Sequence, residues 1–304
     1  MPDAVFITGG SGLLALNWAL ARRDRCRVTL GLHRRSIALA RVHAHPASLD
    51  TVEEIVRTLD EVQPDLVVHT AGLTSIERCE AEPDLARYAN TDLAVNVALA
   101  CARRGVRLVH VSTDHLFPGD EAWTDEQHPV APVNVYGRTK AEAESGVLDA
   151  HPGAMVVRTN FYGWGPPYRR SFSDMVIDSL RKGEPLTLFT DVFYTPILAE
   201  TLGEAVSELV NLETRGIIHL VGDERLSKYD LGVKIAHRFQ LDASLIRPGL
   251  LSDQPGLVRR PLDMSLSNET ARRLLARRLG GVDEQLDRLH EQEQVGLAQE
   301  LQDL

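Results

Sequence analysis

The composition of this 304-residue chain is that of an ordinary globular protein, since 43 % of its residues are hydrophobic and 25 % are charged. A chain of this length can bury a large core, as one large domain or as two closely joined ones. The formal net charge of −10 argues against nucleic acid or an anionic membrane surface as the partner.

The cysteines and histidines indicate neither disulfides nor a metal site. Cys26, Cys79 and Cys101 are odd in number and far apart, without a Cys-x-x-Cys spacing, and the eleven histidines form no metal-ligand motif. We find no signal peptide and no apolar run of about 18 residues. We therefore expect no membrane segment and a cytoplasmic location.

The chain opens with the pattern of a dinucleotide-binding unit. Residues 4–8 form a short apolar run that predicts a buried strand, residues 9–12 predict a glycine turn, and residues 13–21 predict a helix. Gly10-x-Gly12-x-x-Ala15 fits the dinucleotide fingerprint, in which the glycines let the backbone approach a pyrophosphate at a helix N-terminus. The alternative is a tight turn without a ligand. The candidate cofactor-binding residues here are Gly9, Gly10, Ser11, Gly12, Leu13 and Leu14.

The second predicted strand, residues 27–32, ends in a basic stretch. A site for NAD(H) usually places an acidic residue there to bind the ribose 2′-hydroxyl, whereas this chain has His33, Arg34 and Arg35. Arginine at this place suits a 2′-phosphate, so we predict NADP(H) as the preferred cofactor, with NAD(H) possible. The alternative is a basic turn exposed to water.

Strands and helices continue to alternate through residue 158. A helical pattern over 52–59 precedes a strand at 65–69, and a long helix over 83–104 precedes a strand at 107–111. Such alternation predicts an α/β fold, a Rossmann-type doubly wound parallel sheet with ligands at the carboxyl ends of its strands. Ala71 and Gly72 follow one such end and are added to the cofactor-binding candidates.

Tyr136 and Lys140 lie four residues apart on a helix predicted over 134–149, so they share one face. The ammonium can stabilise the phenolate and lower the tyrosine pKa from its usual value of about 10. The alternative is an exposed helix pair that adds little stability. A strand at 155–158 follows.

The second half of the chain departs from this rhythm. Residues 161–214 are predicted to form loops and small elements over the strand ends, 216–221 a returning strand, and 227–239 a helix. The tail from Val282 is an amphipathic helix, which either docks on its own domain or offers a surface to a partner. We predict a dinucleotide-binding domain of residues 1–160 plus about 215–240, and a smaller C-terminal substrate-binding lobe of 161–214 and 241–304.

These motifs, in this order, resemble the extended short-chain dehydrogenase/reductase family, and within it the dTDP-4-dehydrorhamnose reductase group. The resemblance rests on Thr8-Gly9-x-x-Gly12 and on the segments 112–119, 136–142 and 157–160. It implies an NAD(P)H-dependent oxidoreductase that reduces the keto group of a nucleotide-activated 4-keto sugar, with hydride from the nicotinamide.

The resemblance also implies roles for individual residues. Tyr136 would give its proton to the carbonyl oxygen, Lys140 would hold the nicotinamide ribose and lower the tyrosine pKa, and Thr113 would hydrogen-bond the carbonyl, with Ser112 as the fallback. The candidate substrate contacts are Thr74, Asp114, His115, Asn160 and Trp164. The helices 83–104 and 134–150 correspond to those that pair in dimers of this family, so we expect a homodimer, with Tyr88, Leu93, Val97 and Leu148 as candidate interface residues.

Two alternatives stay open. A nucleotide-sugar epimerase or dehydratase would use the same Tyr and Lys with retained NAD, although dehydratases usually have Asp-Glu where this chain has Asp114-His115. A non-catalytic NADP-binding regulatory subunit, like that of methionine adenosyltransferase, also resembles these reductases and shares the Gly-Leu-Leu turn.

Overall fold

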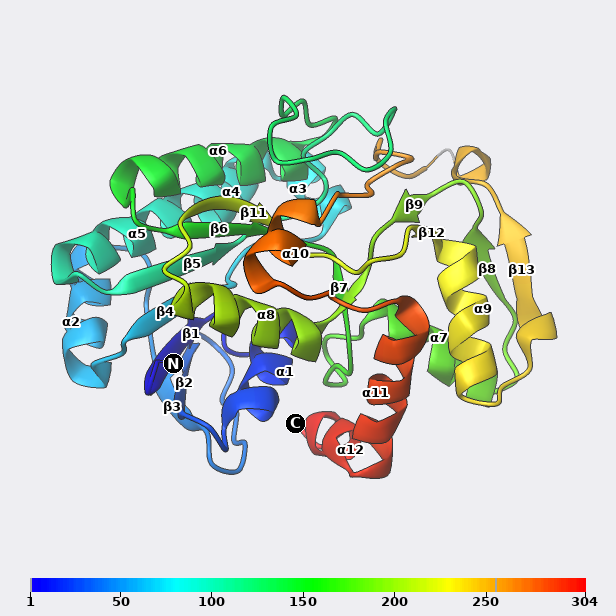
Figure 1. Cartoon of the computed structure of the whole chain (residues 1–304), viewed down its shortest axis with the longest axis horizontal. Coiled ribbons are helices and arrows are strands. Elements are labelled where there is room, and N and C mark those ends of the chain that lie inside the picture. Colours follow the sequence, from blue (N-terminus) through cyan, green and yellow to red (C-terminus); the bar gives the residue numbers. More distant parts are fainter. Residues whose placement is uncertain (1, 255) are drawn as a thin grey trace.

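A seven-stranded parallel sheet forms the centre of the protein (Figure 1). The computed structural model describes residues 2–254 and 256–304. In space the strands follow the order β11-β6-β5-β4-β1-β2-β3. Their bounds are β1 (Ala4–Thr8), β2 (Arg27–Leu32), β3 (His43–Pro46), β4 (Leu66–His69), β5 (Arg107–Val111), β6 (Met155–Arg158) and β11 (Gly216–His219).

This topology confirms the predicted doubly wound α/β class. The chain builds outward from β1 in one direction through β2 and β3, then returns to the other side of β1 through β4. The order therefore reverses between β1 and β4, and such a switch point opens a crevice at the carboxyl ends of the strands. The edge strand β3 was not predicted, because its sequence His-Ala-His-Pro has no apolar run; pairing with β2 creates it.

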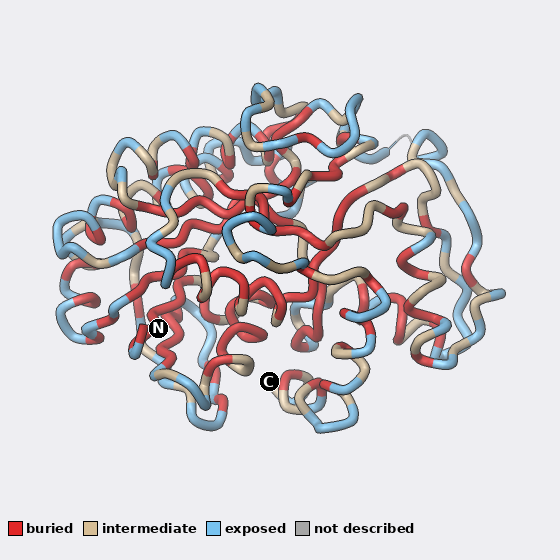
Figure 2. The backbone as a smooth tube through the Cα atoms, viewed as in Figure 1, coloured by how far each residue is buried: buried red, intermediate tan, exposed pale blue. Residues whose placement is uncertain are grey.

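Helices cover both faces of the sheet. On one face lie α2 (Val52–Val62), α5 (Leu93–Arg104) and α6 (Val135–Ala150), and on the other lie α1 (Leu13–Arg22) and α8 (Ala199–Asn211) (Figure 1). Successive strand residues point to opposite faces of the sheet: Val67 is buried in the core under α2 and α5, while Val68 is buried in the core under α1 and α8. The buried backbone in Figure 2 accordingly follows the strands and the inner helix faces.

The predicted helix over 83–104 is interrupted in the structure. It consists of α4 (Pro83–Arg87), a π-helical turn over Tyr88–Asp92, and α5. The wider turn brings the side chain of Asn90 into the molecule, where it is 1 % exposed. π-helical turns inside α-helices are frequent at functional sites, and this one borders the cavity described below.

The smaller lobe is assembled from short elements. The helix α7 (Phe172–Arg181) contacts α9 (Lys228–Arg238), and α9 also contacts β8 and β13, which pair in parallel. The remaining short strands are β7 (Phe161–Tyr162), β8 (Leu186–Phe189), β9 (Phe193–Tyr194), β10 (Ile197–Leu198), β12 (Leu226–Ser227) and β13 (Ile246–Gly249). The other helices are α3 (Ile76–Ala81), α10 (Glu269–Leu275), and 3-10 turns at Ala243–Leu245 and Leu251–Asp253.

Two helices pack across the domain boundary predicted from the sequence. The boundary assigns α8 to the smaller lobe, yet α8 contacts α1 on the sheet. It assigns α9 to the dinucleotide-binding domain, yet α9 contacts α7, α11 (Val282–Gln294), β8 and β13. We therefore propose that α8 belongs to the dinucleotide-binding domain and α9 to the smaller lobe.

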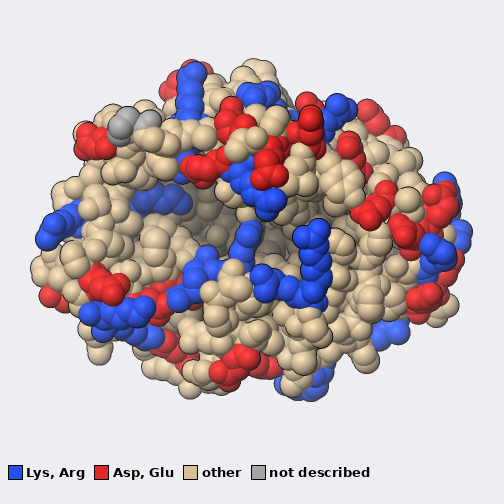
Figure 3. Space-filling model, turned by 180° about the vertical axis from the view of Figure 1, so that it is seen from behind, with Lys and Arg blue, Asp and Glu red and all other residues tan. Residues whose placement is uncertain are grey.

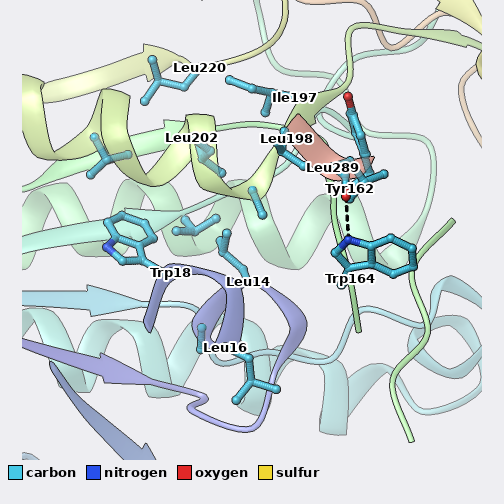
Figure 4. Close-up of a cluster of buried hydrophobic side chains, with 14 of the residues drawn as sticks. Leu14, Leu16, Trp18, Tyr162, Trp164, Ile197, Leu198, Leu202, Leu220 and Leu289 are labelled. Carbon is cyan, nitrogen blue, oxygen red and sulfur yellow. Dashed lines mark hydrogen bonds between the residues drawn. The ribbon is translucent and has the colours of Figure 1, made fainter. Parts of the chain in front are cut away.

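The C-terminal tail docks on its own chain. It forms α11 (Val282–Gln294) and α12 (Leu297–Gln302), whose Leu286, Leu289 and Leu301 are buried in the same core as α1 and α8. The indole of Trp164 donates a hydrogen bond of 3.0 Å to the carbonyl of Leu289 (Figure 4). None of the helices in the described residues is both long and apolar enough to cross a membrane.

The buried tail leads to a stability prediction. Leu289 is fully buried, so Leu289→Ala should leave a cavity and lower the free energy of unfolding by about 2–5 kcal/mol. Val295→Ala is the matched control, since Val295 is 65 % exposed and should change stability by less than about 0.5 kcal/mol. Urea denaturation followed by circular dichroism measures both, and equal stabilities would contradict the docking of the tail.

Candidate active site

A cavity of about 540 Å³ lies at the carboxyl ends of the central strands. The hollowed face in Figure 3, opposite to that of Figure 1, carries Lys and Arg side chains around the hollow. Arg35, Lys140 and Arg169 are the basic residues that line the cavity. The structure brings most of the predicted site residues to it: Gly9, Ser11, Gly12, Leu13, Leu14, Arg35, Ala71, Gly72, Thr74, Ser112, Thr113, Asp114, His115, Tyr136, Lys140 and Asn160.

The glycine turn after β1 has no room for a side chain at its first two residues, Gly9 and Gly10. Gly9 has a φ of +67°, and a Cβ there would lie 2.8 Å from the backbone of Ala71. A Cβ at Gly10 would lie 2.7 Å from the Cβ of Leu30, so Gly10 serves the packing of the turn on β2 rather than the cavity wall. Gly12 is the N-cap of α1. The free N–H groups of that helix end can bind an anion such as a pyrophosphate.

Of the basic residues after β2, Arg35 lines the cavity, whereas His33 and Arg34 are exposed and do not line it. The guanidinium carbon of Arg35 lies 3.9 Å from the centre of the Tyr168 ring, which places it in cation–π contact. The described residues thus fit a phosphate-bearing dinucleotide: a helix N-terminus without side-chain obstruction and one arginine beside it.

The helix α6 carries Tyr136 and Lys140 into the opposite wall. It starts at Val135 because the side chain of Asn134 caps it, accepting a hydrogen bond of 2.9 Å from the N–H of Gly137. The ammonium of Lys140 donates a hydrogen bond of 2.8 Å to the carbonyl of Val111 at the end of β5, and it lies 3.4 Å from Nε2 of His110. Strand β5 therefore anchors the lysine beside the tyrosine.

The pKa values of this pair differ from the sequence interpretation. Burial raises the pKa of Tyr136 to about 12, against a lowering by the hydrogen bond with Thr113. The expected lowering of the tyrosine pKa by Lys140 is not found, because burial of the phenol is the largest influence on this pKa. Burial lowers the pKa of Lys140 to about 8, opposed by the charge of Glu144. Near neutral pH, both groups therefore carry their protons.

The segment after β5 supplies hydroxyl and carboxyl groups. The hydroxyl of Thr113 donates to Oδ1 of Asp114 at 3.2 Å, and Oδ2 of Asp114 accepts 2.6 Å from the amide of Asn160. The hydroxyl oxygen of Ser112 is buried and has no hydrogen-bond partner among the described residues. The ring of His115 meets that of Tyr136 edge-on, with 5.6 Å between centroids, and burial lowers the pKa of the imidazole.

Asn90 is a site residue that the sequence did not single out among the candidates. Its Oδ1 accepts a hydrogen bond of 2.6 Å from the N–H of Leu73, and its Nδ2 donates one of 3.0 Å to Oγ1 of Thr139. It thereby joins the loop after β4 to α6. The side chain of Asn90 points inward because it lies in the π-helical turn. The sequence gives no sign of this turn, since the apolar periodicity over 83–104 predicts one continuous helix.

Trp164 does not belong to the site. The side chain is 1 % exposed and packs edge-on against Phe239, with its N–H bound by Leu289, and it does not line the cavity (Figure 4). The prediction of a substrate contact at Trp164 is therefore corrected: the aromatic stretch contributes this ring to the core. Nearby Tyr168, Arg169 and Phe172 line the cavity in its place.

The described residues contain no cluster of three or more His, Cys, Asp or Glu side chains that could hold a metal ion. Thr113, Tyr136 and Lys140 line the same cavity as the glycine turn and Arg35. Two hydroxyl donors and a cation around one point can stabilise negative charge that develops on a carbonyl oxygen.

Several relatives resemble this chain over most of its length. Probable low-salt glycan biosynthesis reductase Agl14 of Haloferax volcanii is 29 % identical over 264 residues, covering 84 % of this chain and 87 % of the relative. Methionine adenosyltransferase 2 subunit beta of Pongo abelii is 28 % identical, covering 86 % and 79 %. The dTDP-4-dehydrorhamnose reductase of Salmonella typhimurium is 28 % identical over a shorter region, 58 % of this chain and 60 % of the relative.

Solved structures share the fold. The dTDP-4-dehydrorhamnose reductase of Bacillus anthracis in complex with NADP superposes with a TM-score of 0.82 at 24 % identity, covering 96 % of this chain and all of that one. A hypothetical dTDP-4-dehydrorhamnose reductase of Sulfolobus tokodaii gives 0.81 at 26 % identity, covering 93 % and 98 %. The family described as RmlD substrate binding domain matches residues 3–294. This match confirms the resemblance drawn from the motifs, and the chain belongs to the RmlD substrate binding domain family.

Proposed function

We propose that this protein is an NADPH-dependent reductase of a nucleotide-activated 4-keto sugar. The observation that carries the proposal is the convergence of Thr113, Tyr136 and Lys140 on one cavity whose other wall is the glycine turn. The names of the reductases from Haloferax volcanii and Salmonella typhimurium support a sugar-nucleotide or glycan-precursor substrate. The NADP bound in the Bacillus anthracis structure supports the choice of cofactor.

The residues that would hold NADPH are the turn from Gly9 to Gly12, the N-terminus of α1, and Arg35 at the 2′-phosphate. NADPH supplies the hydride. Among the described residues the ammonium of Lys140 has two hydrogen-bond partners, the carbonyl of Val111 and the imidazole of His110, which leaves N–H capacity for the nicotinamide ribose.

Tyr136 supplies the proton. Because burial keeps its pKa near 12, the phenol is protonated at neutral pH and can donate to the carbonyl oxygen as the carbonyl carbon gains hydride. The hydroxyl of Thr113, which donates to Asp114 in the structure, would turn its proton to the same carbonyl oxygen when substrate binds. The products are the sugar alcohol and NADP⁺, and Tyr136 recovers its proton from solvent. We propose Thr74, Asp114, His115 and Asn160, which line the same cavity, as the substrate contacts.

One finding and two experiments bear on the alternatives. The similarity to methionine adenosyltransferase 2 subunit beta supports a regulatory subunit as the second candidate. NADPH binding without turnover of any keto sugar, together with copurification of a partner enzyme, would favour it. Release of NAD from the freshly purified protein on denaturation would favour an epimerase or dehydratase.

A homodimer through α5 and α6 is a further part of the proposal. Tyr88 and Leu99 are exposed on this side, 40 % and 41 % respectively. Leu93 and Leu148 are half-buried, whereas Val97 is fully buried inside the chain and drops out of the candidate interface. Light scattering at micromolar concentration decides this, and a monomer would contradict it. A cytoplasmic location remains a proposal.

Tyr136→Phe tests the catalytic proposal. Loss of the phenol proton should lower kcat for NADPH-dependent reduction by roughly 10²–10⁴-fold, while the Kd for NADPH stays near that of the parent. Tyr229→Phe is the control, because Tyr229 lies on α9 and does not line the cavity. A panel of nucleotide-linked 4-keto sugars is needed for the assay, with NADPH consumption as the readout. Turnover by the Phe variant as fast as by the parent would refute the assigned role.

Lys140 sets the expected pH dependence. With a pKa of about 8, its ammonium is present below that pH and is lost as the pH rises through it. Tyr136 stays protonated and His110 stays neutral over the same range, since burial raises the first pKa to about 12 and lowers the second well below its usual value.

We therefore expect kcat/KM for reduction to fall above about pH 8. Lys140→Arg should remove this fall, although at a lower rate, because a guanidinium keeps its charge. Initial rates between about pH 6 and 10 measure both profiles. A wild-type rate that is constant up to about pH 9.5 would contradict the role of the ammonium.

A further inference from the structure

The loop between β7 and α7 crosses from the smaller lobe to the cofactor side of the cavity. We call residues 166–170 of this loop the strap. The hydroxyl of Tyr168 donates 3.2 Å to the carbonyl of Ser11 in the glycine turn, and the guanidinium of Arg169 donates to the hydroxyl of Thr74 after β4. The ring of Tyr168 also lies against Arg35 after β2. The strap thus touches three segments that surround the cofactor side of the cavity.

Arg35 depends on the strap for its position. It is exposed and, among the residues that the structure describes, has no carboxylate within ion-pair distance. A free arginine on a surface loop samples many rotamers, so holding it in one place requires a contact. The Tyr168 ring supplies that contact at 3.9 Å from the guanidinium carbon.

Stacking leaves the arginine able to bind an anion. A guanidinium is planar, so its face can rest on an aromatic ring while the N–H groups at its edge remain free to donate in a fork to phosphate oxygens. The ring itself is held in place, because the hydroxyl of Tyr168 is bound to Ser11. Burial raises the pKa of this hydroxyl, which keeps it protonated as a donor.

We propose that Tyr168 is a positioning residue that, by stacking on Arg35, holds the guanidinium for the 2′-phosphate and so determines the preference for NADPH over NADH. The inference rests on the proposed function only in placing the 2′-phosphate at Arg35. It assigns cofactor selection to a residue of the strap, more than 130 positions along the chain from Arg35.

Direct titration of the full-length protein tests the proposal without any sugar substrate. Kd values are measured by calorimetry for NADPH and NADH, and for adenosine 2′,5′-bisphosphate and adenosine 5′-monophosphate as probes of the adenosine end. Tyr168→Leu should raise the Kd for NADPH and for the bisphosphate about two- to fivefold, and leave the Kd for NADH and for the monophosphate unchanged. Tyr168→Phe keeps the stacking ring but loses the hydrogen bond to Ser11, so it should weaken NADPH binding less than Tyr168→Leu does.

A double-mutant cycle separates positioning from other effects. In an Arg35→Leu background, Tyr168→Leu should cause no further loss of NADPH relative to NADH, because its effect acts through the arginine. A second cycle changes the arginine to lysine, which keeps a positive charge but loses the planar face. In the Arg35→Lys background, NADPH binding should be insensitive to Tyr168→Leu. If Tyr168→Leu proves unstable by thermal denaturation, Tyr168→Met, which also lacks the aromatic face, replaces it in both cycles.

Three results would overturn the proposal. If Tyr168→Leu weakened the binding of NADPH and NADH equally, the strap would contact the dinucleotide without selecting between the two cofactors. Unchanged affinities would show that Tyr168 does not position Arg35. An effect that persists in the Arg35→Leu background would show that Tyr168 acts by another route. The proposed function would fail in a distinguishable way: the variants would show the expected changes in the Kd for NADPH, but the protein would reduce no keto sugar.

Discussion

The close approach of the turn after β1 to the neighbouring strands is the constraint on which the site depends. A Cβ at Gly9 would meet the backbone of Ala71, and one at Gly10 would meet Leu30, so the turn sits between β2 and β4 only because both side chains are missing. That fit puts the N-terminus of α1 at the point where the strand order reverses. The open helix end, and with it an anion-binding place, therefore lies at the switch point.

The opposite wall is tied to the same sheet by buried polar contacts. Lys140 is bonded to the end of β5, and Asn90 joins the loop after β4 to α6 through Leu73 and Thr139. Because β4 lies between β1 and β5 in the sheet, the helix with the tyrosine and the glycine turn are held in one rigid frame. Such a frame can keep a proton donor and a hydride donor at a constant separation.

Burial sets the protonation states of this frame. It raises the pKa of Tyr136 and lowers that of Lys140, and His110 stays neutral beside the ammonium. At neutral pH the site therefore presents a protonated phenol next to a cation, the state that reduction of a carbonyl requires. Desolvation, rather than the attraction of the lysine for a phenolate, is the dominant cause in the structure.

Local patterns in the sequence were sufficient for the parallel sheet, the glycine turn and the pairing of Tyr136 with Lys140, since strand and helix periodicity and a four-residue spacing depend on near neighbours. Contacts between distant segments were not encoded in any such pattern. Trp164 enters the core because α11 accepts its N–H, and Asn90 turns inward because a π-helical turn interrupts its helix. The pKa of Tyr136 and the contact of Tyr168 with Arg35 likewise arise only when the chain folds, because burial and stacking are properties of surroundings assembled from remote residues.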